Sequence, residues 1–442
     1  MNWIVHNAKQ LHGVISMPGD KSISHRALLH AALAQGTSRI QNFLHAGVTE
    51  AMMRCVRDLG VDFEMEPPGG SAQRFGRLIV HGGHLRSPAA NLDCGNSGAT
   101  IRMLMGALAG QRDLVVTLDG SAGLRRRPMK RVAEPLRWMG AELGDTPPLA
   151  IHGTPLHGIE YTMPVASAQV KAAILLAALQ AEGPTTIHEP GPSRDHSERL
   201  LRSLGVSVVN ENNTVTLTPP DEPLAAFEAI VPGDISSAAF VFAAAALVPN
   251  SKVTVTHVGV NDTRTGILDA LVAMGGDVTV SNVREVNGEP IADITVKSSE
   301  LRGITVDGDL VVRMIDEFPI FAVLASQAQG ETIVREAEEL RVKESDRIGS
   351  LVSELQKLGA QIEERPDGFV IAGPTPLHGA VVDSHGDHRL AMSLAVAGLI
   401  AEGATTVTRA EAYRESFPNF VELLQSLGGT VHEAHKSHES HE

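Results

Sequence analysis

The chain has 442 residues, of which 43% are hydrophobic and only 3% aromatic, and its formal net charge is −15. That length exceeds one ordinary core and predicts two or more domains, while the negative charge argues against general nucleic-acid binding. Two cysteines make no disulfide framework. The longest apolar run, residues 240–248, is too short to span a bilayer, and the first ten residues lack the pattern of a targeting segment. We therefore expect a soluble, cytoplasmic protein.

The chain repeats one kind of segment six times. Each copy has a polar start, a body of small apolar residues, and a Gly or Pro-Asn stop, as a buried helix with a capped N-terminus would. In chain order the six copies begin at Pro18, Asn96, Ser167, Asp234, Asp316 and Asp387. The spacing of roughly 70 residues predicts repeated supersecondary units.

A second recurring signal supports the same six units. A more amphipathic segment ends in Leu-Gly or Met-Gly and leads into an alternating, strand-like run. Each unit should thus hold one buried helix, one surface helix and several short strands. The fold class that follows is mixed α/β (α+β) with three repeats in each of two domains.

The dipeptide Pro-Gly precedes a capped helix twice, at residues 18–19 and 232–233. Three units lie between the two dipeptides, and three follow the second. We interpret the two sites as crossings between domains, although both could be ordinary turns. One domain would be 19–232, and the other would combine 1–18 with 233–430. Residues 431–442 are polar and rich in histidine, which predicts a disordered tail without a functional metal site.

Cations and hydroxyls gather at the helix starts, where unpaired N–H groups attract anions. The first start carries Lys21, Ser22 and Arg26. A later start has Gly98, where the absence of a side chain lets a ligand approach the backbone closely. Further polar residues of the later segments are Ser167, Gln169, Lys171, Arg194, Asp316, Glu317, Arg341, Lys343, Glu344, Asp346, Arg347, Asp387, His388 and Arg389. The Gly-rich loop 120–131 holds five cations and fits a phosphate clamp, although a charge run can also be a solvated face. The mixed charges of 339–347 could likewise be surface ion pairs.

Five of these motifs, in order, resemble the 5-enolpyruvylshikimate-3-phosphate synthase family. They are PGDKSISHR from Pro18, CGNSGATIR from Cys94, ASAQVKAA from Ala166, ELRVKESDRI from Glu339 and GDHRLAM from Gly386. The resemblance covers nearly the whole chain except the tail. It implies the two-domain enolpyruvyl transferase fold of six βαβαββ-type repeats with buried parallel helices and substrates in the interdomain cleft. It also implies transfer of the enolpyruvyl group of phosphoenolpyruvate to the 5-hydroxyl of shikimate 3-phosphate, within aromatic amino acid (chorismate) biosynthesis.

The same resemblance assigns site residues. Shikimate 3-phosphate would be held by Lys21, Ser22, Arg26, Ser167, Ala168, Arg194, Asp316 and Lys343. Phosphoenolpyruvate would be held by Lys21, Gly98, Arg127, Gln169, Arg347 and Arg389. The catalytic residues would be Asp316 as base, Glu344 as proton donor and Lys21 assisting. No cofactor, metal, membrane or nucleic-acid partner is expected, and we expect a monomer.

Two positions depart from the family pattern. Ala168 stands where many members have a second serine, and Glu415 and Ser416 precede Phe417 where some members place a lysine. One phosphoenolpyruvate contact is therefore expected to be absent or replaced. Because Gly98 is retained, the sequence predicts sensitivity to glyphosate, which mimics phosphoenolpyruvate.

Two rival functions fit part of these features. A UDP-N-acetylglucosamine enolpyruvyl transferase would share the architecture, but that family uses a loop cysteine and the loop 120–131 has none. A non-catalytic anion-binding repeat protein is disfavoured by the acids Asp316 and Glu344, since carboxylates in an anion pocket weaken binding unless they perform chemistry.

Overall fold

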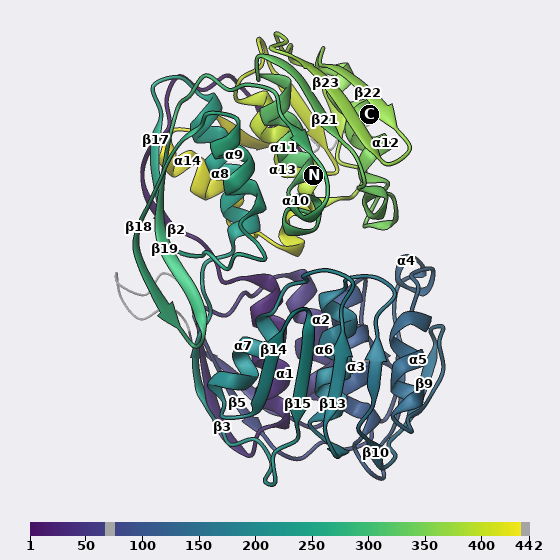
Figure 1. Cartoon of the computed structure of the whole chain (residues 1–442). Helices are drawn as coiled ribbons and strands as arrows, with labels where there is room; N and C mark the ends of the chain where they lie inside the picture. Colours follow the sequence, from purple (N-terminus) through teal and green to yellow (C-terminus); the bar gives the residue numbers. More distant parts are fainter. Residues whose placement is uncertain (67–75, 435–442) are drawn as a thin grey trace, which may run out of the picture. The chain divides into compact units, whose positions relative to one another are not determined.

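The computed structural model describes residues 1–66 and 76–434. Its residues form two compact units, which we call unit 1 and unit 2 (Figure 1). Unit 1 comprises Met1–Met17, Gly233–Arg284 and Ile291–Glu442, and unit 2 comprises Pro18–Pro232 and Glu285–Pro290. The chain therefore passes between them at Met17–Pro18 and Pro232–Gly233. In addition, the tip of one hairpin, Glu285–Pro290, groups with unit 2, a feature that the sequence did not suggest.

Within the described residues one four-stranded sheet occurs six times, three times in each unit. In every copy the first two strands run parallel and the second pairs antiparallel with the third. The six-repeat prediction is confirmed by this pattern.

The sheets of unit 2 are these, in spatial order: β16 (Glu228–Ile230), β3 (Gly36–Gln41), β5 (Arg77–Gly82) and β4 (Asp62–Glu66); β6 (Leu92–Asp93), β7 (Val115–Asp119), β9 (Leu149–His152) and β8 (Glu142–Leu143); β11 (Glu160–Thr162), β13 (Thr185–His188), β15 (Thr214–Thr218) and β14 (Ser207–Glu211). A parallel pair, β10 (Leu156–His157) and β12 (Ala181–Glu182), accompanies them.

The sheets of unit 1 follow the same order of strands: β2 (His12–Ser16), β17 (Lys252–Gly259), β19 (Glu289–Lys297) and β18 (Asp277–Val286); β20 (Thr305–Val306), β21 (Gly330–Val334), β23 (Gly368–Gly373) and β22 (Gln361–Arg365); β24 (Val381–Asp383), β25 (Thr405–Thr408), β1 (Asn2–Val5) and β26 (Val431–Ala434). The N-terminal strand β1 thus completes the last repeat.

One part of the predicted tail is wrong. Residues 431–434 form β26, which pairs antiparallel with β1 and places Val431 opposite Val5. Both valines are fully buried, so the strand is held by an apolar contact that the polar composition of the segment concealed. The rest of the predicted tail, 435–442, lies outside the described residues.

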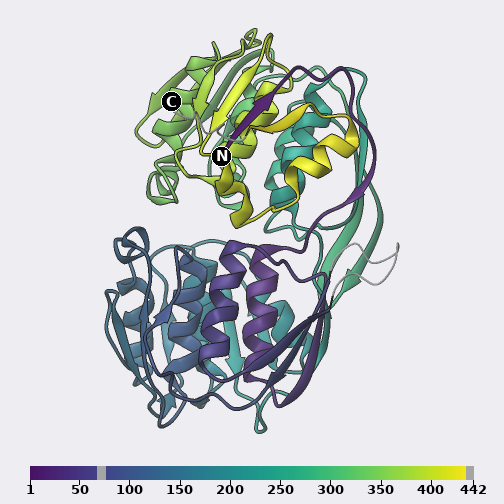
Figure 2. The same ribbon diagram turned by 180° about the vertical axis from the view of Figure 1, so that it is seen from behind.

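Each unit has three buried helices at its core. In unit 2 these are α1 (Lys21–Leu33), α3 (Gly98–Ala109) and α6 (Ala168–Ala178). Helix α3 packs against both α1 and α6, and Figures 1 and 2 show the group from opposite sides. Small residues make the close packing possible: a Cβ at Gly106 of α3 would lie 2.0 Å from the carbonyl oxygen of Ala173 in α6.

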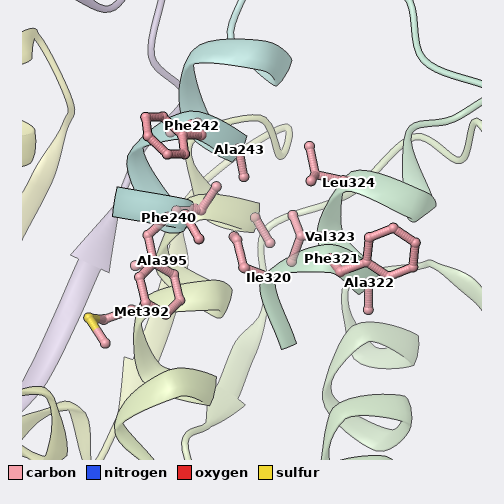
Figure 3. Close-up of a cluster of buried hydrophobic side chains, with 14 of the residues drawn as sticks. Phe240, Phe242, Ala243, Ile320, Phe321, Ala322, Val323, Leu324, Met392 and Ala395 are labelled. Atoms are coloured by element: carbon pink, nitrogen blue, oxygen red, sulfur yellow. The ribbon is translucent and has the colours of Figure 1, made fainter. Parts of the chain in front are cut away.

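The buried helices of unit 1 are α8 (Ile235–Leu247), α11 (Phe318–Ser326) and α13 (His388–Gly398). Figure 3 shows where they meet: Phe240 from α8, Ile320 from α11 and Met392 from α13 turn into one apolar cluster. The amphipathic helices outside these cores are α2 (Gly47–Asp58), α5 (Lys130–Trp138), α7 (His196–Ser203), α9 (Gly266–Ala273), α12 (Arg347–Lys357) and α14 (Phe420–Leu427). The short helices α4 (Ala122–Arg125), α10 (Asp309–Arg313), η1 (Glu338–Val342) and η2 (Ala410–Glu415) lie in the connections.

Candidate functional site

The buried helices of unit 2 begin at the polar motifs that the sequence singled out. Asp20 caps α1 by accepting a hydrogen bond from the backbone N–H of Ile23 at 2.9 Å. Ser97 caps α3 by accepting from the N–H of Thr100 at 3.2 Å, whereas no side chain caps α6. The first N–H groups of a helix have no partner inside it, so they suit an anion.

The Arg26 side chain connects the starts of three helices, α1, α6 and α7. Its Nε donates to Ser197 Oγ of α7 at 2.7 Å, and its Nη1 donates to the carbonyl oxygen of Ser22 at 2.9 Å. Its Nη2 donates to the carbonyl oxygen of Ala168 at 3.4 Å. Burial lowers the pKa of Arg26 to about 10, and the positive charge of Arg194 acts in the same direction. The structure thus brings together Ser22, Arg26 and Ala168 near Arg194.

A second cluster forms around the start of α3. A Cβ at Gly98 would lie 2.9 Å from Arg127 Nη1 and 3.1 Å from Arg102 Nη1. Arg102 also donates to Gln169 Oε1 of α6 and, at 3.4 Å, to the carbonyl oxygen of Pro128. The structure therefore places Gly98, Arg127 and Gln169 together, with Arg102 between them. Two guanidinium groups at a helix start are suited to bind a phosphate or carboxylate.

In unit 1 the predicted acids gather around one arginine. The Arg347 side chain is 1% exposed, and three carboxylates surround it. Its Nη2 lies 2.8 Å from Glu344 Oε2, its Nη1 3.5 Å from Asp316 Oδ1, and its Nε 2.8 Å from Asp387 Oδ2. Asp316 and Glu344 are thus held on either side of one guanidinium.

The charge states around Arg347 follow from this contact. Burial alone would lower the pKa of Arg347, but the carboxylates of Asp387, Glu344 and Asp316 raise it above its usual range. Burial opposes ionisation of Asp387, yet Arg347 outweighs it and lowers the pKa of that carboxyl. Asp387 also caps α13 by accepting from the N–H of Arg389 at 2.8 Å. A buried ion pair therefore fixes the start of α13.

The three buried helices of unit 1 also begin at the same place. Ser236 of α8 donates to Glu317 Oε1, and Arg389 Nη1 of α13 lies 4.0 Å from the same oxygen. Glu317 is the N-cap residue of α11 and is fully buried. Arg264 Nη2 donates to Ser236 Oγ at 2.6 Å and lies 3.3 Å from Asp234 Oδ1. Shared contacts at their N-termini show that the three helices run parallel, as predicted.

The two predicted lysines lie beside residues of their own segments. Lys343 ends η1, and its Nζ lies 3.1 Å from Glu339 Oε1. Lys21 opens α1, and its carbonyl oxygen lies 2.7 Å from His25 Nδ1. In the part of the chain that the structure describes, no group of three or more His, Cys, Asp or Glu side chains could hold a metal ion. The same residues contain no helix long and apolar enough to cross a membrane.

Comparison with known proteins gives one consistent result. The family model for EPSP synthase (3-phosphoshikimate 1-carboxyvinyltransferase) matches residues 5–424. The chain belongs to this family. A 3-phosphoshikimate 1-carboxyvinyltransferase from Gloeobacter violaceus is 50% identical over 94% of the chain and 96% of that relative. Another from Herpetosiphon aurantiacus is 49% identical over 95% of the chain and 98% of that relative.

A solved structure agrees with the sequence comparisons. EPSP synthase from Acinetobacter baumannii matches with a TM-score of 0.87 and 40% identity, covering 98% of the chain and all of that structure. The predicted enolpyruvyl transferase fold and the predicted enzyme class are confirmed. The rival UDP-N-acetylglucosamine enolpyruvyl transferase is not favoured.

One member of the Gly98 cluster, Arg102, was not predicted from the sequence. Arg102 follows Gly98 by four positions, so a shared helix face was a usable signal. Lys171 was expected at an anion site, but its Nζ lies 2.7 Å from Glu189 and 2.6 Å from Glu198 in a buried ion-pair network. Those glutamates are 18 and 27 positions away, and no short-range pattern could reveal such a contact.

Proposed function

We propose that this chain transfers the enolpyruvyl group of phosphoenolpyruvate to the 5-hydroxyl of shikimate 3-phosphate and releases inorganic phosphate. The observation that carries the proposal is the pair of proposed catalytic acids, Asp316 and Glu344, held by the single buried guanidinium of Arg347. In a protein that only bound anions, two carboxylates at a cationic group would weaken the binding.

Shikimate 3-phosphate would take the cluster built on Arg26. Lys21, Ser22, Arg26 and Arg194 supply cations and a hydroxyl, and Ser167 and Ala168 supply the start of α6. Support comes from the hydrogen bonds that Arg26 makes to Ser22 and Ala168. Asp316 and Lys343 would complete this set from unit 1, with Asp316 accepting the proton of the 5-hydroxyl.

Phosphoenolpyruvate would take the cluster at the start of α3. Gly98 opens α3 there with a backbone N–H that has no partner within the helix, and Arg127 and Gln169 flank it. Lys21, Arg347 and Arg389 would bind the remaining charges of the same substrate. Because Arg347 already holds Glu344 at 2.8 Å, an anion bound to this guanidinium would compete with Glu344 for it. Binding would in this way release Glu344 for proton transfer.

The chemistry is an addition followed by an elimination. In the addition, Glu344 donates a proton to the methylene carbon, the 5-oxygen bonds to the adjacent carbon, and Asp316 takes the hydroxyl proton. In the elimination, the carbon–oxygen bond to phosphate breaks, the methyl group returns a proton to Glu344, and the phosphate leaves. Lys21 would assist by balancing the charge. The tuning of two carboxyl groups by their surroundings is what such acid–base work requires.

A phosphate-release assay tests the proposal. Phosphate should appear only when shikimate 3-phosphate and phosphoenolpyruvate are both present, and omission of either substrate should abolish it. Release from phosphoenolpyruvate alone, or with UDP-N-acetylglucosamine as acceptor, would contradict the proposal. Glyphosate at millimolar concentration should inhibit the reaction because Gly98 leaves the phosphoenolpyruvate position open; unimpaired turnover would refute that expectation.

We further propose that the enzyme works as a cytoplasmic monomer. The two free, buried cysteines fit a reducing compartment. Size-exclusion chromatography with light scattering should give a mass near 46.9 kDa, and twice that mass would contradict the monomer.

A further inference from the structure

Lys171 makes an unusual set of contacts in unit 2. Its side chain is 1% exposed, although it carries a full positive charge. Its Nζ lies 2.7 Å from Glu189 Oε2 and 2.6 Å from Glu198 Oε1, and these two carboxylates are 3% and 0% exposed. A buried charge is tolerated only when it is well paired. The ammonium group and the two carboxylates therefore form one buried ion-pair network.

The two carboxylates mark the two ends of one segment. Glu189 directly follows strand β13, and Glu198 lies in the first turn of helix α7. Between them runs the segment that carries Arg194. Ser193, the residue before Arg194, donates its hydroxyl hydrogen to Glu189 Oε1. A single ammonium group thus closes the base of the loop, and a serine ties the position next to Arg194 to the same network.

The network also reaches Arg26. Ser197, next to Glu198, accepts the hydrogen bond from Arg26 Nε at 2.7 Å. Burial lowers the pKa of Arg26, whereas the charge of Glu198 opposes that change. Burial raises the pKa of Glu198, and Lys171 acts against it. Lys171 accordingly favours the ionised form of Glu198 beside Arg26, and its ion pair with Glu198 holds the turn of α7 whose Ser197 hydroxyl accepts from Arg26.

We propose that Lys171 is a positioning residue of the shikimate 3-phosphate subsite, which fixes Arg194 through the loop 189–198 and Arg26 through α7. This inference rests on the proposed function of Arg26 and Arg194. It gives Lys171 no contact with substrate: the residue acts through the two carboxylates that it binds. The effect should be larger on shikimate 3-phosphate than on phosphoenolpyruvate, because both carboxylates flank the segment that carries Arg194, whereas Lys171 is linked to the Gly98 cluster through Gln169 on the same helix.

The decisive experiment compares Lys171→Met with Lys171→Arg. Isothermal titration calorimetry measures the Kd for shikimate 3-phosphate, and steady-state assays measure KM for phosphoenolpyruvate and kcat. A misplaced group can cost up to about 100-fold in activity. We therefore expect Lys171→Met to raise the Kd for shikimate 3-phosphate by at least about tenfold. KM for phosphoenolpyruvate should stay within about threefold, and Lys171→Arg, which keeps the charge, should restore most of the affinity.

Lys357→Met provides the matched control. Lys357 also pairs with a buried glutamate, since its Nζ lies 2.8 Å from Glu354 Oε2, but it belongs to unit 1. It should leave the Kd for shikimate 3-phosphate unchanged. An equal effect of Lys171→Met on both substrates, or no effect on either, would overturn the inference.

Ser193→Ala keeps the inference testable if Lys171→Met does not fold. This variant removes only the hydroxyl that ties Arg194's neighbour to Glu189, and it leaves the ion pairs in place. We expect a Kd for shikimate 3-phosphate raised by about threefold or more, with KM for phosphoenolpyruvate unchanged; an unchanged Kd would count against the inference. The wild-type enzyme separates the two proposals: no turnover in the wild type would sink the proposed function, whereas normal turnover with an unaffected variant would sink only the role of Lys171.

Discussion

Substitution of Gly98 by alanine probes the proposed phosphoenolpyruvate cluster at its tightest point. The added Cβ would lie 2.9 Å from Arg127 Nη1 and 3.1 Å from Arg102 Nη1, whereas ordinary van der Waals contact begins at 3.4 Å. Both guanidinium groups must therefore move away from the start of α3. The atoms in the way are the ends of flexible side chains, so the fold can accommodate the change.

The expected cost falls on binding. Hydrogen bonds to charged groups contribute about 1.5–3 kcal/mol each, and about 1.4 kcal/mol corresponds to a tenfold change. Loss of one such contact should raise KM for phosphoenolpyruvate by about 10- to 100-fold. Stability should not fall, because alanine is a better helix former than glycine by up to about 1 kcal/mol.

Steady-state kinetics with each substrate varied in turn provide the assay. Gly98→Ala should raise KM for phosphoenolpyruvate, while KM for shikimate 3-phosphate stays within about threefold, since Gly98 lies outside the Arg26 cluster. Gly144→Ala is the control, because the nearest atom to its Cβ would lie at 3.7 Å. The reasoning fails if Gly98→Ala leaves KM for phosphoenolpyruvate unchanged, or if it raises KM for both substrates by the same factor.

Three further perturbations test other parts of the account. Glu344→Gln should lower kcat by about 10²- to 10⁴-fold without raising either KM; retained turnover would exclude Glu344 as the proton donor. Arg347→Met leaves the buried carboxylate of Asp387 without its charged partner and should lower the free energy of unfolding by about 3–5 kcal/mol, as measured by urea denaturation. Arg335→Met, which breaks an exposed pair with Asp307, should cause no comparable loss in the free energy of unfolding. Equal losses in the two variants would contradict the claim that burial makes the Arg347 pair important for stability. Burial lowers the pKa of His30 from 6.5 to about 4, so between these values the unfolded chain binds a proton that the folded chain does not. His30 should therefore contribute a fall of about 3 kcal/mol in the free energy of unfolding as the pH drops from about 6.5 to about 4, beside a similar contribution from buried His25, whose pKa is also lowered to about 4. His30→Gln should reduce that slope; identical slopes would refute the assignment.

The fold was predictable because its signals are local and repeated. Each buried helix carries its polar start, its small apolar body and its stop within about 17 contiguous residues. The side chains of Asp20, Ser97, Asp234 and Asp387 cap four of these helices, whereas α6 and α11 have no side-chain cap. The strand β26 was missed since its polar residues resemble a tail. The strand forms because it pairs with β1, more than 400 positions away, where Val431 lies opposite Val5 in the core of unit 1.

The candidate site was predictable in its residue types but not in its contacts. Arg26, Gly98 and Arg347 stand in motifs that indicate anion binding. Gly98 and Arg347 are the first residues of α3 and α12, and Arg26 lies in the second turn of α1. The partners of these residues come from other repeats. Arg102 meets Gln169 across 67 positions and Arg347 meets Asp387 across 40, and such pairs depend on how helices pack. Their roles toward the two substrates remain predictions.

The most direct measurement is proton NMR of the product formed in deuterated water. Addition and elimination pass the methylene carbon of phosphoenolpyruvate through a methyl group, so one incoming proton comes from solvent through Glu344. The account predicts deuterium in the enolpyruvyl methylene of the product, with inorganic phosphate formed in equal amount. A product whose methylene carries no deuterium would show that the carbon is never protonated, and the proposed mechanism would be wrong.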